Sequence, residues 1–293
     1  MKQSQTNHLL GYPPDARLLI INADDFGMCQ AINAAVIRAF PHDLLCSTTL
    51  MVPCPWALHA MRFLREHPEI PFGVHLTALA EWPDYRWGPI TPKEKAPSLV
   101  DKAGYFYNFE QMPGFLAQVR LGELEMEFRA QIETVLAAGL KPTHLDWHAL
   151  RLGSRPDILA LMVQLAKAYG LALRVIGRSW IEQVQSQGLP TIDYDFLDSY
   201  SLDLVDKAAQ YAHLLRTLPA GLSEWAVHPG LNNAELLAIE GDSKHVRQSD
   251  FDFLLSQEAQ AIVKEEGIIL LDYGPLQAVW RSVAQAVAPG RLD

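Results

Sequence analysis

The sequence predicts an α/β protein, an irregular (β/α) barrel of about seven parallel strands that forms a single domain over residues 1–293. Three observations predict this fold class. Short apolar runs alternate with helical segments, no linker or internal repeat divides the chain, and the length suits one α/β barrel. Strands separated by helices in this way run parallel, with right-handed crossovers. A doubly wound open sheet is the structural alternative, because sequence alone does not determine whether the sheet closes.

The first elements follow one another closely. Residues 17–24, RLLIINAD, are a continuous apolar run, as expected of a strand that is buried on both faces. Helical spacing of apolar residues follows at 30–40. Further strands are expected at 45–53 and 72–78, with a helix at 56–68 between them. Residues 1–16, which precede the first strand, are expected to form a flexible extension.

A long segment then interrupts the alternation. Residues 81–114 are rich in proline, glycine and aromatic side chains, which is typical of an inserted loop rather than of a helix or strand. After this segment the alternation resumes and continues toward the C-terminus. The expected elements are a helix at 124–140, a strand at 143–149, a helix at 155–170, a strand at 171–177, an irregular stretch to about 201, a helix around 202–217, a strand at 224–230, a helix around 249–266 and a strand at 268–273.

Composition narrows the classes of partner. The formal charge of −10 and the pI near 5.4 argue against binding to nucleic acid or to an anionic membrane surface. No apolar run approaches the roughly 18 residues of a membrane helix, so membrane insertion is not expected. The opening segment also lacks the apolar core of a signal peptide. Three cysteines without metal-binding spacing indicate reduced thiols and a cytoplasmic location.

Polar residues gather where the expected strands end. In parallel α/β folds, ligands bind beyond the carboxyl ends of the strands, so residues that perform chemistry should collect there. Five separate elements contribute such residues, which is more than chance would place at one edge. They are Asp24 and Asp25 after the first strand, His75 in the third, His148 in the fourth, Arg174 in the fifth and His228 at the end of a later one.

The segment NADDFG, residues 22–27, contains the DFG tripeptide of protein kinases. The glycine-rich loop, strand lysine and catalytic loop that a kinase needs upstream are absent, so the tripeptide is a coincidence. A metal site fits better, because one carboxylate and two imidazoles are common ligands of Zn²⁺ and similar ions. Adjacent carboxylates on an extended chain point to opposite faces, so Asp24 and Asp25 are expected to differ in role, one binding metal and one accepting a proton. A strand end that caps the next helix is the structural alternative.

Residues 143–148, THLDWH, allow two readings. On a helix, His144 and His148 would share one face and could grip one ion. The segment follows a helix stop and should be a strand, where positions four apart lie roughly 13 Å from each other. His148 is then the better ligand, Asp146 is a candidate partner of a ligand or of substrate, and His144 is expected deeper in the sheet.

Two further histidines are candidates because of their position. His75 alone would be read as a core residue, but its place near a strand end beside the other polar residues favours a role in the site. His228 precedes Pro229 and Gly230, which turn the chain away from the strand. This presents an imidazole at the rim, where it is suited to act as a general acid. An unpartnered turn residue is the alternative for His228.

Together these residues resemble the YdjC-like carbohydrate deacetylases, distant kin of the polysaccharide deacetylases. The matching pieces are NADDFG (22–27), GVHL (73–76), THLDWH (143–148), LALR (171–174) and VHPG (227–230). The resemblance implies a barrel-like fold and a divalent metal ion held by Asp25, His75 and His148. It also implies hydrolysis of an N-acetyl group on an amino sugar or short oligosaccharide, with Asp24 as base and His228 as acid. Arg174 would keep Asp24 ionised, or alternatively form an ordinary ion pair in the barrel.

The resemblance leaves the substrate contacts open. Many similar chains continue past the second histidine with further histidines, whereas this one has ALRL at 149–152. Trp82 and Trp87 in the insertion, which is expected at the active-site end, are candidates to stack on sugar rings. They are equally candidates to pack the insertion onto the barrel.

Several expectations complete the hypothesis. The metal is one divalent ion, Zn²⁺ or Mg²⁺ foremost, with Mn²⁺ and Co²⁺ also compatible with the ligands. The partner is a small carbohydrate, and a homodimer stays open. Two other functions remain: a metal hydrolase of another amide or of an acetyl ester, and a sugar-binding protein with a vestigial metal site.

Overall fold

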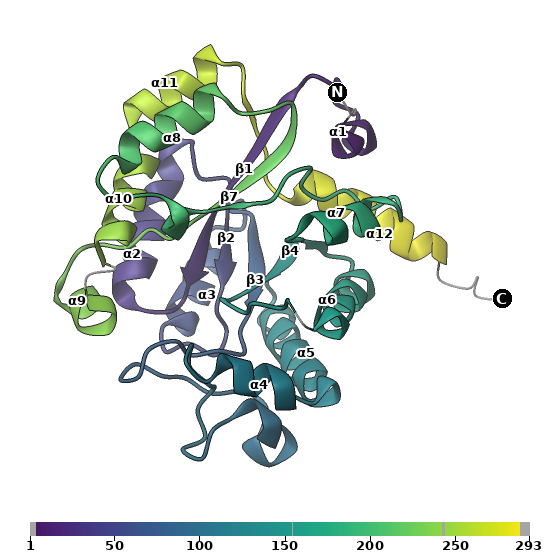
Figure 1. Ribbon diagram of the computed structural model, residues 1–293, viewed down its shortest axis with the longest axis vertical. Helices are drawn as coiled ribbons and strands as arrows, with labels where there is room; N and C mark the ends of the chain where they lie inside the picture. Colours follow the sequence, from purple (N-terminus) through teal and green to yellow (C-terminus); the bar gives the residue numbers. More distant parts are fainter. Residues whose placement is uncertain (1–3, 154, 242–243, 288–293) are drawn as a thin grey trace.

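A single curved parallel sheet organises the molecule. The computed structural model describes residues 4–153, 155–241 and 244–287 (Figure 1). The strand order is β5-β4-β3-β2-β1-β7-β6, β8 pairs with β1 beside this path, and all of these pairings are parallel. The strands are β1 (Arg17–Phe26), β2 (Ser47–Leu50), β3 (Phe72–Leu76), β4 (His144–Trp147), β5 (Ala172–Leu173), β6 (Leu197–Asp198), β7 (Gly221–Val227) and β8 (Ile269–Leu270). The predicted single α/β domain with parallel strands is confirmed.

The sheet curls into a half-barrel. Arg174 follows β5 at one end of the path, and Glu224 lies on β7 near the other end. Arg174 Nε nevertheless lies 2.8 Å from Glu224 Oε1, so the two ends of the sheet face each other across the interior. No strand pairing joins β5 to β6 in the part of the chain that the structure describes. Side chains, and not backbone hydrogen bonds, therefore close the gap.

Helices surround the sheet and connect its strands (Figure 1). Residues Leu18–Phe26 of β1 are all buried, as its apolar run predicted, because β1 is the central strand. The helices are α1 (Gln5–Leu10), α2 (Gln30–Ala39), α3 (Ala57–Glu66), α4 (Met112–Gln118), α5 (Leu121–Ala137), α6 (Pro156–Tyr169), α7 (Arg178–Gln185), α8 (Lys207–Arg216), α9 (Ala234–Glu240), α10 (Lys244–Leu254), α11 (Gln257–Glu265) and α12 (Gly274–Val287). None of them is both long and apolar enough to cross a membrane, for the described residues.

The structure differs from the expected elements in several places in the second half of the chain, where α9 and α12 were also not expected. The helix expected around 249–266 is two helices, α10 and α11, because Ser256 caps the second one and interrupts the run. Strand β6 and helix α7 lie in the stretch that was expected to be irregular up to about residue 201. Both are short, with eight residues in α7 and two in β6.

The N-terminal segment contains a helix. Residues 1–16 were expected to be a flexible extension, and the structure describes them from residue 4 onward. Ser4 caps α1 at its start, and Gly11 ends it in a left-handed conformation. Thr6 Oγ1 donates to the carbonyl of Thr191 at 2.5 Å, which ties α1 to the barrel.

The insertion at 81–114 folds onto the carboxyl end of the sheet beside α4 and α5 (Figure 1). Its own core contains Trp87, Leu99 and Phe106, all buried. Glu127 on α5 accepts hydrogen bonds from the backbone N–H groups of Ile90 and Thr91 at 3.1 and 2.9 Å. The insertion is therefore a packed part of the domain at the end where the predicted site lies.

Candidate active site

The end of β1 contains a backbone irregularity that aims two carboxylates at one place. Ala23 pairs with Thr48 and Phe26 with Leu50, so β1 has one extra residue here, a β-bulge. Asp25 adopts a left-handed conformation with φ of 67°, which is uncommon for a residue other than glycine. The bulge removes the alternation that would send Asp24 and Asp25 to opposite faces. Both carboxylates line one cavity and are almost completely buried.

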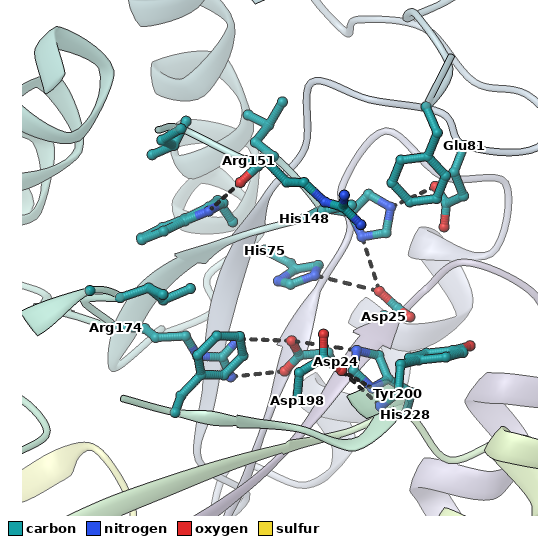
Figure 2. Close-up of a pocket in the computed structure, with 18 of the residues that line it drawn as sticks. Asp24, Asp25, His75, Glu81, His148, Arg151, Arg174, Asp198, Tyr200 and His228 are labelled. Atoms are coloured by element: carbon teal, nitrogen blue, oxygen red, sulfur yellow. Dashed lines mark hydrogen bonds and ion pairs between the residues drawn. The ribbon is translucent and has the colours of Figure 1, made fainter. Parts of the chain in front are cut away.

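Three predicted metal ligands meet at this point (Figure 2). The ligand atoms of Asp25, His75 and His148 all lie within 4.8 Å of one another. Asp25 Oδ1 is 3.4 Å from His75 Nε2 and 3.1 Å from His148 Nδ1. Atoms that each lie about 2.0–2.1 Å from a tetrahedral ion are about 3.3 Å apart. The spacing therefore fits a single divalent ion.

Each imidazole has a second carboxylate on its other nitrogen. His75 Nδ1 donates to Asp146 Oδ1 at 2.7 Å, and His148 Nε2 donates to Glu81 Oε2 at 2.7 Å. Metal-binding histidines usually have such a carboxylate, which fixes the ring and the tautomer. In both rings the nitrogen left facing Asp25 is thereby available to a cation. This arrangement indicates a metal centre more strongly than the three ligands alone.

The electrostatics of the cluster favour an added positive charge. Burial lowers the pKa of His75, but Asp146 and Asp25 outweigh it and raise the pKa to about 10. Burial likewise lowers the pKa of His148, and Glu81 and Asp25 raise it to about 9. Burial raises the pKa of Asp25, yet Arg247 and the two histidines hold it well below the ordinary value. The site is built for a cation, whether a proton or a metal ion.

Asp24 belongs to a network around Arg174, which Asp146 joins to the cluster of Asp25, His75 and His148. Arg174 grips it with two nitrogens, Nη1 to Oδ2 at 2.7 Å and Nη2 to Oδ1 at 2.9 Å. Burial raises the pKa of Asp24, but the guanidinium of Arg174 outweighs burial and holds the pKa below its ordinary value. Arg174 also contacts Asp146 at 2.8 Å and Glu224 at 2.8 Å. One buried arginine thus balances three buried carboxylates, and Asp24 is ionised at neutral pH.

His228 lies on the far side of Asp24 from the metal ligands (Figure 2). It follows β7, and its Nε2 lies 4.0 Å from Asp24 Oδ2. Its Nδ1 is hydrogen bonded to Ser199 Oγ at 2.8 Å, which fixes the ring. The imidazole lines the cavity and keeps slight exposure, so it can exchange a proton with a bound molecule.

The cavity in front of these groups has a volume of about 760 Å³. This size suits a ligand larger than a monosaccharide. Charged groups form its floor, and aromatic rings form much of its wall: Trp82, Phe109, Trp147, Trp180, Phe196 and Tyr200. Such walls are typical of sites that stack on flat apolar faces of a ligand.

The two candidate tryptophans of the insertion have different surroundings. Trp82 lines the cavity, and its indole N–H has no hydrogen-bond partner among the described residues. Trp87 is buried, donates to the carbonyl of Leu79 at 2.9 Å and packs near the ring of His148, with 6.1 Å between ring centroids. Trp87 therefore packs the insertion onto the sheet and does not line the cavity.

His144 lies away from the metal cluster, as the strand spacing predicted. It is fully buried and stacks on Tyr273 with 3.7 Å between ring centroids. Burial lowers its pKa to about 3, so the ring is neutral. A Cβ on Gly73 would approach the His144 ring to 2.6 Å, so glycine is required beside it.

Several charged residues of the site were missing from the sequence-based hypothesis. Glu81, the first residue of the insertion, binds His148, and Glu224 on β7 binds Arg174. Arg247 on α10 contacts Asp25, and Asp250 on the same helix accepts the backbone N–H of His228 at 2.8 Å. Glu81 had a signal, since it lies just past β3. Arg247 and Asp250 had none, because they lie on a helix whose face toward the site is set by tertiary packing.

Comparisons with known proteins find a family, several relatives and a solved structure to which this chain is similar. A sequence model of the YdjC-like protein family matches residues 18–265. A carbohydrate deacetylase from Enterococcus faecalis is 33% identical over 270 residues, covering 88% of this chain and 97% of that protein. A chitooligosaccharide deacetylase from Serratia marcescens is 28% identical, covering 87% and 97%. A crystal structure from E. faecalis, named provisionally as a cellobiose-phosphate cleavage protein, is similar with a TM-score of 0.77, 31% identity, and coverage of 89% and 99%.

Proposed function

Because the chain belongs to the YdjC-like protein family, we propose that it is a metal-dependent deacetylase that removes an N-acetyl group from an amino sugar or a short N-acetylated oligosaccharide. Relatives that span nearly the whole chain are named carbohydrate or chitooligosaccharide deacetylases, which supports the reaction class. One observation carries the proposal for this chain. The cluster of Asp25, His75 and His148 shares a cavity with an ionised Asp24 and with His228.

Asp25, His75 and His148 would hold one divalent metal ion. The donor set fits, because each histidine keeps one nitrogen toward Asp25 and gives the other to a carboxylate. When bound, the ion supplies Lewis acidity to the acetyl carbonyl and to the attacking water. One carboxylate and two imidazoles suit Zn²⁺, Mg²⁺, Mn²⁺ and Co²⁺ in different degrees.

Asp24 is the proposed general base. It is ionised because Arg174 offsets the effect of burial, so it is ready to accept a proton from the attacking water. A carboxylate with a lowered pKa is a weak base, so Asp24 would work together with an ion that Asp25, His75 and His148 hold. Arg174 also fixes the carboxylate in direction, since it binds both oxygens.

His228 is the proposed general acid. Its Nε2 lies 4.0 Å from Asp24 Oδ2, and both residues line the cavity, so the proposed acid and base border the same part of it. The ring would donate a proton to the departing amine, which leaves as a neutral group. Ser199 holds the other ring nitrogen and keeps Nε2 toward the cavity.

The aromatic wall supports a carbohydrate as substrate. Sugar rings present apolar faces of C–H groups, and the ring of Trp82 is among the aromatic side chains that line the cavity. A cavity of about 760 Å³ has room for more than one sugar ring. A cytoplasmic location is part of the proposal, supported by three free cysteines.

The test is acetate release from N-acetylglucosamine and its oligomers by the protein loaded with each of the four metals. Asp24→Asn should abolish turnover and keep the metal, because Asp24 is outside the ligand set. Asp157→Asn is the control, since it removes a carboxylate from a surface ion pair with Arg155. This control should leave turnover unchanged.

Each outcome assigns a different function. Acetate release from acetyl esters but from no N-acetyl sugar would favour the ester hydrolase. Sugar binding without hydrolysis, in protein that holds stoichiometric metal, would favour a binding protein. Full activity in Asp24→Asn would show that Asp24 is not the base.

A further inference from the structure

Helix α10 brings two buried charged residues to the site from outside the sheet. Arg247 and Asp250 are one turn apart on α10, and the exposed fraction of each is 2% or less. Arg247 lies against the metal-binding end, and Asp250 lies against His228. Both contacts reach residues that the proposed reaction uses.

The two oxygens of Asp25 face different partners. Oδ1 faces His75 Nε2 at 3.4 Å and His148 Nδ1 at 3.1 Å, whereas Oδ2 faces Arg247 Nη1 at 2.9 Å. A carboxylate that is free to rotate exchanges its oxygens and can bind an ion through both. The contact with Arg247 opposes this rotation and leaves Oδ1 as the oxygen for the ion. This matters here because Asp25 lies at a bulge, in a strained backbone conformation.

Arg247 is itself held on several sides. Its Nε donates to Glu240 Oε1 at 2.5 Å, and its guanidinium lies 5.8 Å from the centre of the Tyr200 ring. Its backbone carbonyl accepts from the N–H of Gly230 at 3.1 Å. A Cβ on Gly230 would be 3.0 Å from Arg247 Cβ and Cδ, so the turn after β7 packs closely on this side chain. Arg247 is a fixed support and not a mobile surface arginine.

Asp250 ties the same helix to the acid side of the site. It accepts the backbone N–H of His228 at 2.8 Å and the hydroxyl of Tyr211 at 2.8 Å, and it pairs with Lys207 Nζ at 2.5 Å. Tyr200, which lies over Arg247, also contacts the ring of His228, with 4.8 Å between centroids. Helix α10 therefore contacts the metal-binding end of the site through Arg247 and the His228 end through Asp250.

We propose that α10 is the positioning element of this site, with Arg247 as the positioning residue that orients Asp25 toward the metal ion. The inference rests on the proposed function, because it concerns the same metal centre. Removing Arg247 should weaken metal binding even when the fold is intact. Substitution of groups that orient metal ligands typically costs about 10- to 100-fold in metal affinity.

The experiment measures Zn²⁺ affinity by competition with a chromogenic chelator, using the full-length wild-type protein, Arg247→Met and Arg247→Lys. We expect about 10- to 100-fold weaker binding by Arg247→Met. Arg247→Lys should recover part of the lost affinity, because it keeps a positive charge near Asp25. The recovery should be incomplete, because one ammonium cannot contact both Asp25 and Glu240 as a guanidinium does. Arg17→Met is the matched control, since it breaks the ion pair of Arg17 with Glu266 at the other end of β1. Its Zn²⁺ affinity should equal that of the wild type.

The inference is wrong if a folded Arg247→Met variant binds Zn²⁺ with an affinity within twofold of the wild type. If that variant does not fold, a folded Arg247→Lys with unchanged affinity overturns the inference as well. Failure of both to fold also counts against positioning, because the pair would then serve the fold alone. Failure of the wild type to bind any of the four metals would instead refute the proposed function, so the two ideas fail separately. If the positioning inference and the proposed function are both right, kcat of Arg247→Met falls by a larger factor than its KM changes.

Discussion

Replacing Arg174 with methionine should inactivate the protein through Asp24. Arg174 is buried and lies within 2.9 Å of three carboxylates, those of Asp24, Asp146 and Glu224. It is the group that holds the pKa of Asp24 down against burial. Without Arg174, burial dominates and raises that pKa. The base is then protonated over a wider acidic range, and the acid limb of the kcat profile moves to higher pH.

The size of the effect follows from the same contacts. Removing one partner of a buried ion pair costs about 3–5 kcal/mol. For a chain of this length, that cost corresponds to a fall in Tm on the order of 10 °C. Loss of a general base typically lowers the rate by about 10²- to 10⁴-fold, which is the expected change in kcat at pH 7.

The assay is acetate release against pH, together with thermal melts of the same samples. Arg174→Lys should restore part of the activity, because it returns one positive charge beside Asp24. Arg129→Met is the control, since it loses a partly exposed pair with Glu125 and a contact with Tyr169, both away from the cavity. Such pairs contribute about 0.3–0.5 kcal/mol. An acid limb at the wild-type pH in a folded Arg174→Met would refute the reasoning.

Three other outcomes are expected. Metal binding at pH 7 should release protons, because the metal-free pKa values of His75 and His148 are about 10 and about 9. For the same reason, metal affinity should rise with pH up to that range. Calorimetry in buffers of different ionisation enthalpy measures the released protons, and a measurement of no release would contradict this prediction. Trp82→Ala should raise KM by about 3- to 10-fold with little change in Tm, whereas Trp87→Ala should destabilise the fold by about 3–5 kcal/mol; equal effects on Tm would contradict this contrast. Burial raises the pKa of the Cys29 and Cys46 thiols to about 12 and that of Cys54 well above its ordinary value. The native protein at pH 8 should therefore resist alkylation, whereas the unfolded protein should react at all three cysteines. Rapid alkylation of the native protein would be contrary evidence.

The sequence was sufficient for the family and for predicting that Asp25, His75 and His148 lie together. The strand ends carry Asp25, His75 and His148, and the carboxyl ends of parallel strands meet at one edge of a sheet, so proximity follows from topology. Strand spacing was also sufficient to separate His148 from His144. These inferences needed only the order of elements and the two-residue repeat of a strand.

The sequence was insufficient for groups that reach the site from other elements. Glu81 comes from the insertion, and Trp87, which was a candidate for sugar contact, packs behind His148. Arg247 is more than 200 positions from Asp25 along the chain, and only the packing of α10 brings it to that carboxylate. Such contacts leave no local pattern, because they depend on how distant elements pack.

By itself, then, the sequence determined the parallel α/β fold, the edge where the chemistry lies and the residue types available there, since these follow from local periodicity and chain order. The tertiary structure alone decided how those residues are aimed. The bulge at Asp25 directs the carboxylates of Asp24 and Asp25 into one cavity. Arg174 then forms an ion pair with Asp24, and Arg247 forms one with Asp25. Direction and charge balance arise from long-range contacts in a buried space, where one misplaced charge costs several kcal/mol.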